Sequence, residues 1–166
     1  RPNHIAVVGD SAGGGLAITT MLRAREKGLP LPAAAMPLSP WVDMEGKGAT
    51  FQTNAEKDVL VSQPMVQMMA GMFLGPNGDP RNKLANPTQA DLAGLPPLFI
   101  QVGGDEALLD DSRALAAAAR RAGVDVTIEV EPEMQHVYHV LAGTAPEADA
   151  AIGRLATWVR PKLELG

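Results

Sequence analysis

Apolar runs alternate along this chain with segments rich in helix-forming residues. Three of the runs contain almost no polar positions, which is typical of strands buried on both faces of a parallel sheet. They cover residues 5–8, 33–38 and 98–102. In a fourth segment, Val124–Val130, apolar residues alternate with Asp, Thr and Glu. This alternation predicts a strand with one solvent-facing side, which places it near a sheet edge.

Helical segments follow these strands. The sequence predicts a helix over each of three stretches, residues 12–27, 110–122 and 146–159. Asp110 or Asp111 is the expected cap of the second helix, and the run 144–147 (Thr-Ala-Pro-Glu) predicts a capping box for the third. Residues 43–87, rich in polar residues and proline, predict an excursion with one or two helices. Strands and helices therefore alternate, which predicts an α/β fold with a mostly parallel sheet and helices on both faces.

Composition and charge narrow the classes of protein to consider. The 166 residues are 46% hydrophobic and 20% charged, which suits a single globular domain. A formal net charge of −5 without a run of Lys or Arg gives no indication of a nucleic acid or an anionic membrane as partner. No apolar run approaches the roughly 20 residues of a membrane-spanning helix. Cysteine is absent, which excludes disulfides, thiol nucleophiles and cysteine-ligated zinc.

One motif joins a predicted strand to a predicted helix. Gly9-Asp10-Ser11-Ala12-Gly13 matches G-x-S-x-G in the strand–turn–helix context of a nucleophile elbow. A serine at such a turn has a strained backbone, and we expect Gly9 and Gly13 to supply the space that it needs. The amide of Ala12, at the helix start, could then donate to an oxyanion. A glycine-rich turn that binds phosphate or only reverses the chain is the alternative, although no G-K-[ST] or G-x-G-x-x-G motif supports it.

A serine nucleophile needs a base, and the chain has three histidines. His4 precedes the strand that leads to Ser11, whereas sites in parallel sheets form at the carboxyl ends of the strands. His136 and His139 follow the fourth strand at that edge. His136 is closer to the strand end and is the predicted base. We expect His139 to pack or form a hydrogen bond in the turn before the last helix.

The base in turn needs a carboxylate that orients it. Asp105 and Glu106 follow the third strand, between serine and histidine in chain order. Adjacent side chains leave a strand in different directions, so we expect one of the two to face His136. Asp110 and Asp111 are better explained as helix caps or as first-turn acids that complement the helix dipole.

These residues resemble the hormone-sensitive lipase family of α/β-hydrolases. The resemblance runs in order along nearly the whole chain, through residues 9–14, 38–43, 95–103, 106–112, 122–124 and 134–136. It implies a carboxylic ester hydrolase in which Ser11 attacks the ester carbonyl, His136 transfers the proton, and water later releases the acyl group. The family's acid usually heads an Asp-Pro-Leu motif, a register that places it at Glu106, with Asp105 as the alternate acid. His136 is followed by Val137 where the family commonly has glycine.

The resemblance covers the C-terminal portion of such an enzyme. We expect residues 1–166 to be part of an α/β-hydrolase catalytic domain whose N-terminal strands and cap lie outside this chain, and the missing N-terminal segment of the same protein to be its partner. The family's His-Gly-Gly oxyanion motif does not occur here, so we expect the isolated chain to be inactive or impaired. Residues 50–75 resemble a cap contribution, in which five residues either pack or line an acyl site: Met65, Met68, Met69, Met72 and Phe73.

The resemblance further implies a small-molecule ester as substrate and no metal or organic cofactor. Family members often dimerise through the last strand, so a homodimer through Val124–Val130 is expected, unless its acidic residues guard the edge. A cytoplasmic location is the expected one. Two other functions remain open: a non-catalytic small-molecule-binding protein on the same scaffold, against which the retention of His136 counts, and another serine hydrolase such as a peptidase.

Overall fold

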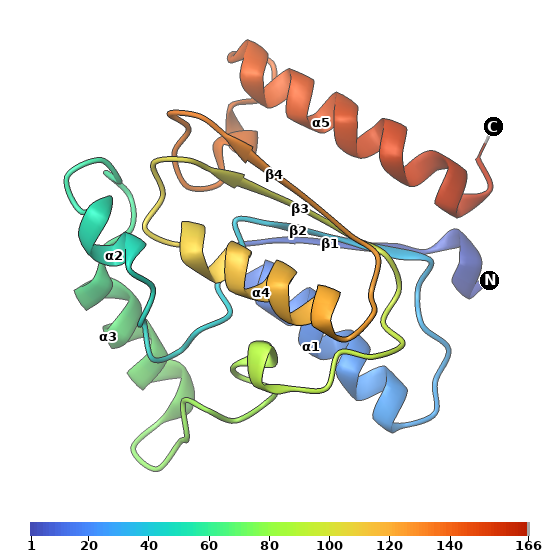
Figure 1. Cartoon of the computed structure of the whole chain (residues 1–166), viewed down its shortest axis with the longest axis horizontal. Coiled ribbons are helices and arrows are strands. Elements are labelled where there is room, and N and C mark those ends of the chain that lie inside the picture. The colour runs from blue at the N-terminus through green and yellow to red at the C-terminus, as the bar shows by residue number, and fades with distance from the viewer. Residues whose placement is uncertain (166) are drawn as a thin grey trace.

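The computed structural model describes residues 1–165. Within this range, one parallel sheet has the strand order β1-β2-β3-β4 (Figure 1). The strands are β1 (Ala6–Asp10), β2 (Ala34–Leu38), β3 (Leu98–Gly103) and β4 (Val126–Glu131). All four carboxyl ends therefore lie at the same edge of the sheet, where the chain turns that follow them meet.

Helices cover both faces of this sheet, which confirms the predicted α/β fold. Figure 1 shows α1 (Ala12–Glu26) and α4 (Leu109–Arg121) on one face and α5 (Pro146–Val159) on the other. Between β2 and β3 the chain leaves the sheet and forms α2 (Thr50–Thr53) and α3 (Gln63–Leu74). Short 3₁₀ helices span Pro2–His4, Pro87–Gln89, Tyr138–Leu141 and Arg160–Leu163.

The side chains of β3 show how the two layers are built. Leu98 and Ile100 belong to a buried cluster that includes Leu115 of α4. Phe99, between them in sequence, packs instead with Leu155 of α5. Strand side chains alternate between the faces of a sheet, so a nearly continuous apolar run supplies both clusters. Burial of each such side chain stabilises the fold by about 1.5–3 kcal/mol relative to exposure.

β1 forms one edge of the described sheet. Within the described range it is hydrogen-bonded to β2 alone, and Val8 is 56% exposed. Ile5, which precedes the strand, is 52% exposed. An exposed apolar edge is what we expect here if the N-terminal strands of the domain lie outside this chain, and burial of β1 on both faces in the full-length protein stays a prediction.

β4 forms the opposite edge, as its alternating pattern predicted. Arg154 of α5 reaches across to it and donates to Glu129 Oε2 at 2.8 Å and to Glu131 Oε2 at 2.6 Å. These two acidic side chains are thus engaged within the chain. A homodimer through Val124–Val130 stays a prediction.

The predicted cap of α4 is wrong, whereas the expected position of Asp110 and Asp111 in the first turn of the helix is confirmed. Leu108, rather than either aspartate, is the N-cap residue, and it makes no side-chain cap hydrogen bond. Asp111 is buried, and its Oδ2 accepts hydrogen bonds from the backbone N–H groups of Val42 and Asp43, both at 2.9 Å. Burial raises the pKa of Asp111 to about 7 despite these two donors. Asp111 therefore links the segment after β2 to α4 through hydrogen bonds and does not cap a helix.

The capping box predicted at α5 is also absent. Ala145 is the N-cap residue, and no side chain caps the helix. Thr144 Oγ1 donates to the carbonyl of Leu141 at 2.7 Å, so this hydroxyl is engaged in the turn before the helix. The predicted Pro in the first turn is present, and the helix ends at Val159 as expected.

Candidate active site

The turn between β1 and α1 places Ser11 at the carboxyl edge of the sheet. Its backbone has φ 53° and ψ −120°, outside the regions that residues with side chains ordinarily adopt. Its N–H donates to the carbonyl of Leu38 at 2.9 Å. Its carbonyl accepts from the N–H groups of Gly14 and Trp41, at 3.0 and 2.9 Å. Several hydrogen bonds thus hold the strained turn that a nucleophile elbow requires.

The steric need for glycine at this turn falls on Gly9 and Gly14 rather than on Gly13. A Cβ atom added to Gly9 would collide with the Gly13 carbonyl, and one added to Gly14 would lie 2.8 Å from Pro40 Cβ. A Cβ on Gly13 would meet nothing closer than Asp10 Oδ1 at 3.9 Å. The expectation that Gly13 supplies space is therefore wrong, because its surroundings are already open.

This difference predicts opposite outcomes for two alanine substitutions in the full-length protein. We expect Gly9→Ala to lower the free energy of unfolding by about 1–3 kcal/mol, the usual cost of overpacking a tight site. Gly13→Ala is the matched control and should be neutral or stabilising by up to about 1 kcal/mol, since alanine is favoured over glycine in helices. Urea unfolding followed by circular dichroism compares them. Equal destabilisation by both substitutions would contradict the steric assignment.

Three side chains from the ends of three strands form a continuous hydrogen-bonded series. His136 Nε2 lies 2.9 Å from Ser11 Oγ, and His136 Nδ1 lies 2.9 Å from Glu106 Oε2. The Glu106 side chain is fully buried, and that of His136 is 11% exposed. A buried carboxylate at this distance favours the imidazole tautomer with hydrogen on Nδ1, which leaves Nε2 free to accept a proton from Ser11.

The two candidate acids face different partners. Asp105 Oδ1 lies 3.0 Å from Lys57 Nζ, on a partly exposed side of the turn. Glu106, one residue later, points toward His136. Adjacent side chains thus diverge as expected, and Glu106 is the carboxylate in contact with the imidazole.

Buried polar contacts hold the turn that carries Glu106. Glu106 Oε1 accepts from the backbone N–H of Gly103 and from Ser39 Oγ, both at 2.6 Å. Asn54 Nδ2 donates to the Glu106 carbonyl at 2.8 Å, and Asp58 Oδ2 accepts from the next backbone N–H at 2.7 Å. The excursion between β2 and β3 therefore fixes the position of the acid.

The loop that carries His136 is tied to the same excursion. Gln135 Nε2 donates to the Lys57 carbonyl at 3.0 Å, and Gln135 Oε1 accepts from the Val59 N–H at 3.1 Å. No local spacing predicts these contacts of Gln135, Asn54 and Asp58, because each meets a partner 49 to 78 residues away. For Ser39 the sequence offers one indication of a role in the site, namely its position directly after a predicted strand, at the carboxyl edge of the sheet.

The other two histidines lie apart from Ser11. His4 Nδ1 is 3.0 Å from the carbonyl oxygen of Leu163, beyond the amino end of β1. His139 is buried and packs against the Tyr138 ring, with 4.1 Å between ring centroids. Its Nε2 lies 3.1 Å from Gln101 Oε1, so His139 packs and forms a hydrogen bond as predicted.

The protonation state of His139 follows from its neighbours. Gln101 Nε2 donates to Glu129 Oε2 at 2.9 Å, so the amide oxygen of Gln101 faces His139 and accepts from its Nε2–H. Within residues 1–165, His139 Nδ1 has no hydrogen-bond partner. A proton added there would lack an acceptor, and burial lowers the pKa of His139 to about 4.

This lowered pKa predicts a pH-dependent stability. Between about pH 6.5 and pH 4 the unfolded chain binds a proton at His139 that the folded chain does not, so the free energy of unfolding decreases as the pH falls through this window. We expect the difference in unfolding free energy between wild type and His139→Gln to vary with pH in this window and to be constant above it. The comparison cancels the opposite contribution of Asp111, whose raised pKa favours the folded state as the pH falls. Denaturant titrations at several pH values measure it, and a constant difference throughout would contradict the assignment.

An apolar cavity of about 150 Å³ opens beside the first turns of α1. Ala12 and Leu16 of α1 line it, together with Trp41 and Phe73. Trp41 is also buried in the core and donates its Nε1–H to the Asp43 carbonyl at 3.0 Å. Its packing role is therefore clear, and it presents one side to the cavity next to the residue that follows Ser11.

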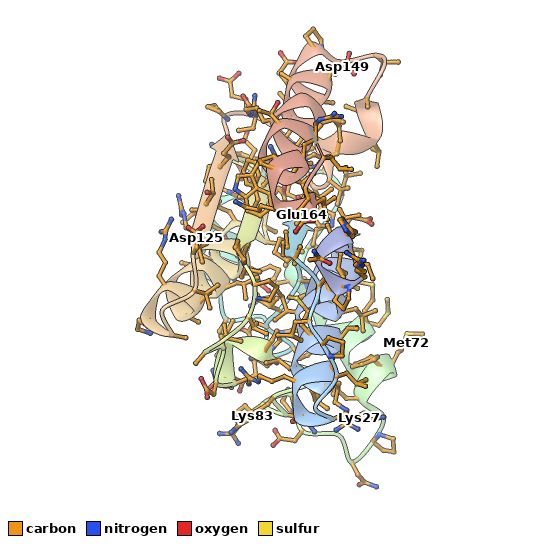
Figure 2. All side chains as sticks on the ribbon, turned by 90° about the vertical axis from the view of Figure 1, so that its right-hand side faces the viewer. Lys27, Met72, Lys83, Asp125, Asp149 and Glu164 are labelled. Atoms are coloured by element: carbon orange, nitrogen blue, oxygen red, sulfur yellow. The ribbon has the colours of Figure 1, made fainter. Side chains whose placement is uncertain are left out.

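The methionines of α3 divide between packing and exposure. Met65 and Met69 pack against the buried cluster that contains Trp41. Met68 is 59% and Met72 77% exposed, and Figure 2 shows Met72 pointing away from the body of the protein. Of the five residues considered for an acyl site, Phe73 is the one that lines the cavity. Whether residues 50–75 form part of a cap stays a prediction.

Residues 1–165 contain no group of three or more His, Cys, Asp or Glu side chains that could hold a metal ion. No helix within that range is long and apolar enough to cross a membrane.

Comparison with known proteins places this geometry in a family. A family model described as "alpha/beta hydrolase fold" matches residues 1–140. The fold also matches the crystal structure of an esterase from the bacterial hormone-sensitive lipase family, with a TM-score of 0.96 and 47% sequence identity. The match covers 98% of this chain and 55% of that one. The chain belongs to the hormone-sensitive lipase family of α/β-hydrolases.

Proteins similar to this chain include several that are named for ester hydrolysis. An acetyl-hydrolase of Streptomyces hygroscopicus is 44% identical over 159 residues, which cover 96% of this chain and 53% of the relative. An esterase of Acinetobacter venetianus is 30% identical over 156 residues, covering 94% and 52%. The crystal structure of an esterase/lipase from an uncultured bacterium matches with a TM-score of 0.94 at 42% identity, covering 99% and 55%. The chain thus spans about half the length of the curated relatives it matches.

One departure from the hormone-sensitive lipase pattern places a β-branched residue in a strained backbone conformation. Val137 stands after His136 where glycine is common, and its backbone is left-handed, with φ 51° and ψ 44°. Glycine adopts this region freely, whereas a β-branched residue there is strained. The Val137 N–H donates to Ser39 Oγ at 3.1 Å, a bond that helps to hold this conformation.

Proposed function

We propose that this chain carries the catalytic triad of a carboxylic ester hydrolase, with Ser11 as nucleophile, His136 as general base and Glu106 as the orienting acid. The observation that carries the proposal is the series of two 2.9 Å contacts that links the three side chains at the strained elbow. The names of the relatives, acetyl-hydrolase and esterase, support ester hydrolysis.

In the proposed acylation step, Ser11 Oγ attacks the ester carbonyl carbon and passes its proton to His136 Nε2. The imidazolium that forms keeps its Nδ1–H, which donates to Glu106 Oε2, and the negative charge of this carboxylate stabilises the imidazolium. The carbonyl oxygen becomes an oxyanion, which accepts from the Ala12 N–H, because the first amides of a helix have no acceptor within that helix. The intermediate then collapses: the bond to the alcohol oxygen breaks, His136 protonates that oxygen, and the acyl group stays on Ser11.

In the proposed deacylation step, water takes the place of the alcohol. His136 removes a proton from the water, the hydroxide adds to the acyl carbon, and the carboxylic acid leaves as the proton returns to Ser11. The apolar cavity beside Ala12 would accommodate a small apolar part of the ester. Its lining is apolar except for Thr19, which suits a short hydrocarbon group.

The proposal is tested by comparing an ester with an amide in the full-length protein. We expect p-nitrophenyl acetate to be hydrolysed at least about a hundredfold faster than 4-nitroacetanilide, since the same triad would face a much poorer leaving group in the amide. Faster hydrolysis of peptide anilides would favour a peptidase, and binding without hydrolysis of either would favour a non-catalytic protein. The isolated 166-residue chain is expected to hydrolyse the ester more slowly than the full-length protein by about two orders of magnitude or more. The reason is that the family's His-Gly-Gly oxyanion motif does not occur in it, which leaves Ala12 as the assigned donor.

A further inference from the structure

We propose that Ser39 is a positioning residue of the triad, an inference that rests on the proposed function. Ser39 directly follows β2, and its N–H donates to the Gln101 carbonyl of β3 at 2.7 Å. β2 lies between the strand that leads to Ser11 and the strand that leads to Glu106. The topology therefore brings Ser39 to the centre of the edge at which the three triad side chains meet.

The single hydroxyl of Ser39 contacts both sides of the acid–base pair. It donates to Glu106 Oε1 at 2.6 Å and accepts from the Val137 N–H at 3.1 Å. A hydroxyl can donate and accept at the same time, which neither alanine nor glycine can do. Glu106 meets His136 through its other oxygen, Oε2. Ser39 thus reaches His136 through the carboxylate and also through the peptide bond that follows the histidine.

Burial makes these bonds hard to replace. Ser39 and Glu106 are both fully buried. A hydrogen bond to a charged group is stronger in such surroundings, and water cannot take the place of a lost partner there. Without the hydroxyl, Glu106 Oε1 would keep the Gly103 N–H as its donor, and the Val137 N–H would lose its acceptor.

The backbone conformations of Ser39 and Val137 also support a positioning role for Ser39. Ser39 has φ 44° and Val137 has φ 51°, both in the left-handed region that disfavours side chains. Strain of this kind persists where the surroundings over-determine the conformation. A second buried serine offers a contrast: Ser112 is equally enclosed, yet within the described residues its hydroxyl has no hydrogen-bond partner. Enclosure alone does not impose the contacts that Ser39 makes.

The test measures the rate at which a fluorophosphonate labels Ser11 in the full-length protein, as a function of pH. We expect Ser39→Ala to slow labelling about ten- to a hundredfold, the effect of losing one hydrogen bond to a buried charge. Ser112→Ala, the matched control, should stay within about twofold of wild type. Loss of a donor leaves more negative charge on the Glu106 oxygens, which favours protonated His136. The fall in rate on the acid side should therefore begin at higher pH in Ser39→Ala.

A second variant covers the case in which Ser39→Ala fails to fold. Ser39→Gly also removes the hydroxyl, but glycine adopts φ 44° without strain, and we expect the same loss of rate and the same shift in pH profile. The inference is overturned if both variants label like Ser112→Ala with an unchanged pH profile, or if neither of them folds. Absence of labelling in the wild type would instead overturn the proposed function, and this inference with it.

Discussion

Ser11→Ala in the full-length protein is expected to lower ester hydrolysis by about three or more orders of magnitude. The nucleophile and its base act as a unit, so removal of the serine hydroxyl leaves only what binding and the oxyanion donor contribute. The fold should be retained, because alanine fits the space of serine and the bonds that hold the elbow are made by its backbone. Steady-state kinetics with a nitrophenyl ester measure the loss, and thermal unfolding checks the fold.

The matched control for this substitution is Ser62→Ala. Ser62 is exposed at the start of α3, and its side chain makes no cap hydrogen bond. We expect its replacement to leave the rate unchanged. Full activity in Ser11→Ala would assign the nucleophile to another residue.

Glu106→Gln is expected to depress turnover by about two to four orders of magnitude. Glutamine preserves the size of the side chain and can still accept from Gly103 and Ser39 through its oxygen. The amide nitrogen then replaces Oε2 and donates to His136 Nδ1, which forces hydrogen onto Nε2 and removes the acceptor for the Ser11 proton. The pH dependence of kcat/KM and the rate together report this change of tautomer.

Asp105→Asn is the comparison that makes this result specific. Asp105 pairs with Lys57, whose side chain is 57% exposed, and such pairs contribute about 0–1 kcal/mol. We expect a change in turnover of a fewfold at most. A reversed outcome, with Asp105→Asn severe and Glu106→Gln mild, would show the acid to be displaced by one position.

Much of the fold and the main contacts of the site followed from local patterns. Apolar runs predicted three of the strands, an alternating pattern predicted the fourth, and the G-x-S-x-G motif predicted the turn at Ser11. The carboxyl-edge rule for parallel sheets then separated His136 from His4, because chain order alone places each residue at one end of a strand. The family register favoured Glu106 over Asp105, and the two side chains do face different partners.

What the sequence could not predict depends on contacts between distant segments. Asp111 was an expected helix cap, but it lies in the first turn of α4, where its buried carboxylate accepts from two backbone donors of the segment after β2. Thr144 fits a capping box, but its hydroxyl is already engaged by the preceding turn. Ser39 meets Glu106 across 67 residues, and no local spacing signals that contact.

The proposed activation of Ser11 by His136 and Glu106 is tested most directly by peptide mapping after fluorophosphonate treatment. The full-length protein is treated with the probe, digested and analysed by mass spectrometry, with a heat-denatured sample as control. We expect one phosphonyl adduct, on the peptide that contains Ser11, in the native protein only, because an unactivated serine reacts too slowly to be labelled. An adduct on any other residue of the native protein, or no adduct at all, would contradict the assignment.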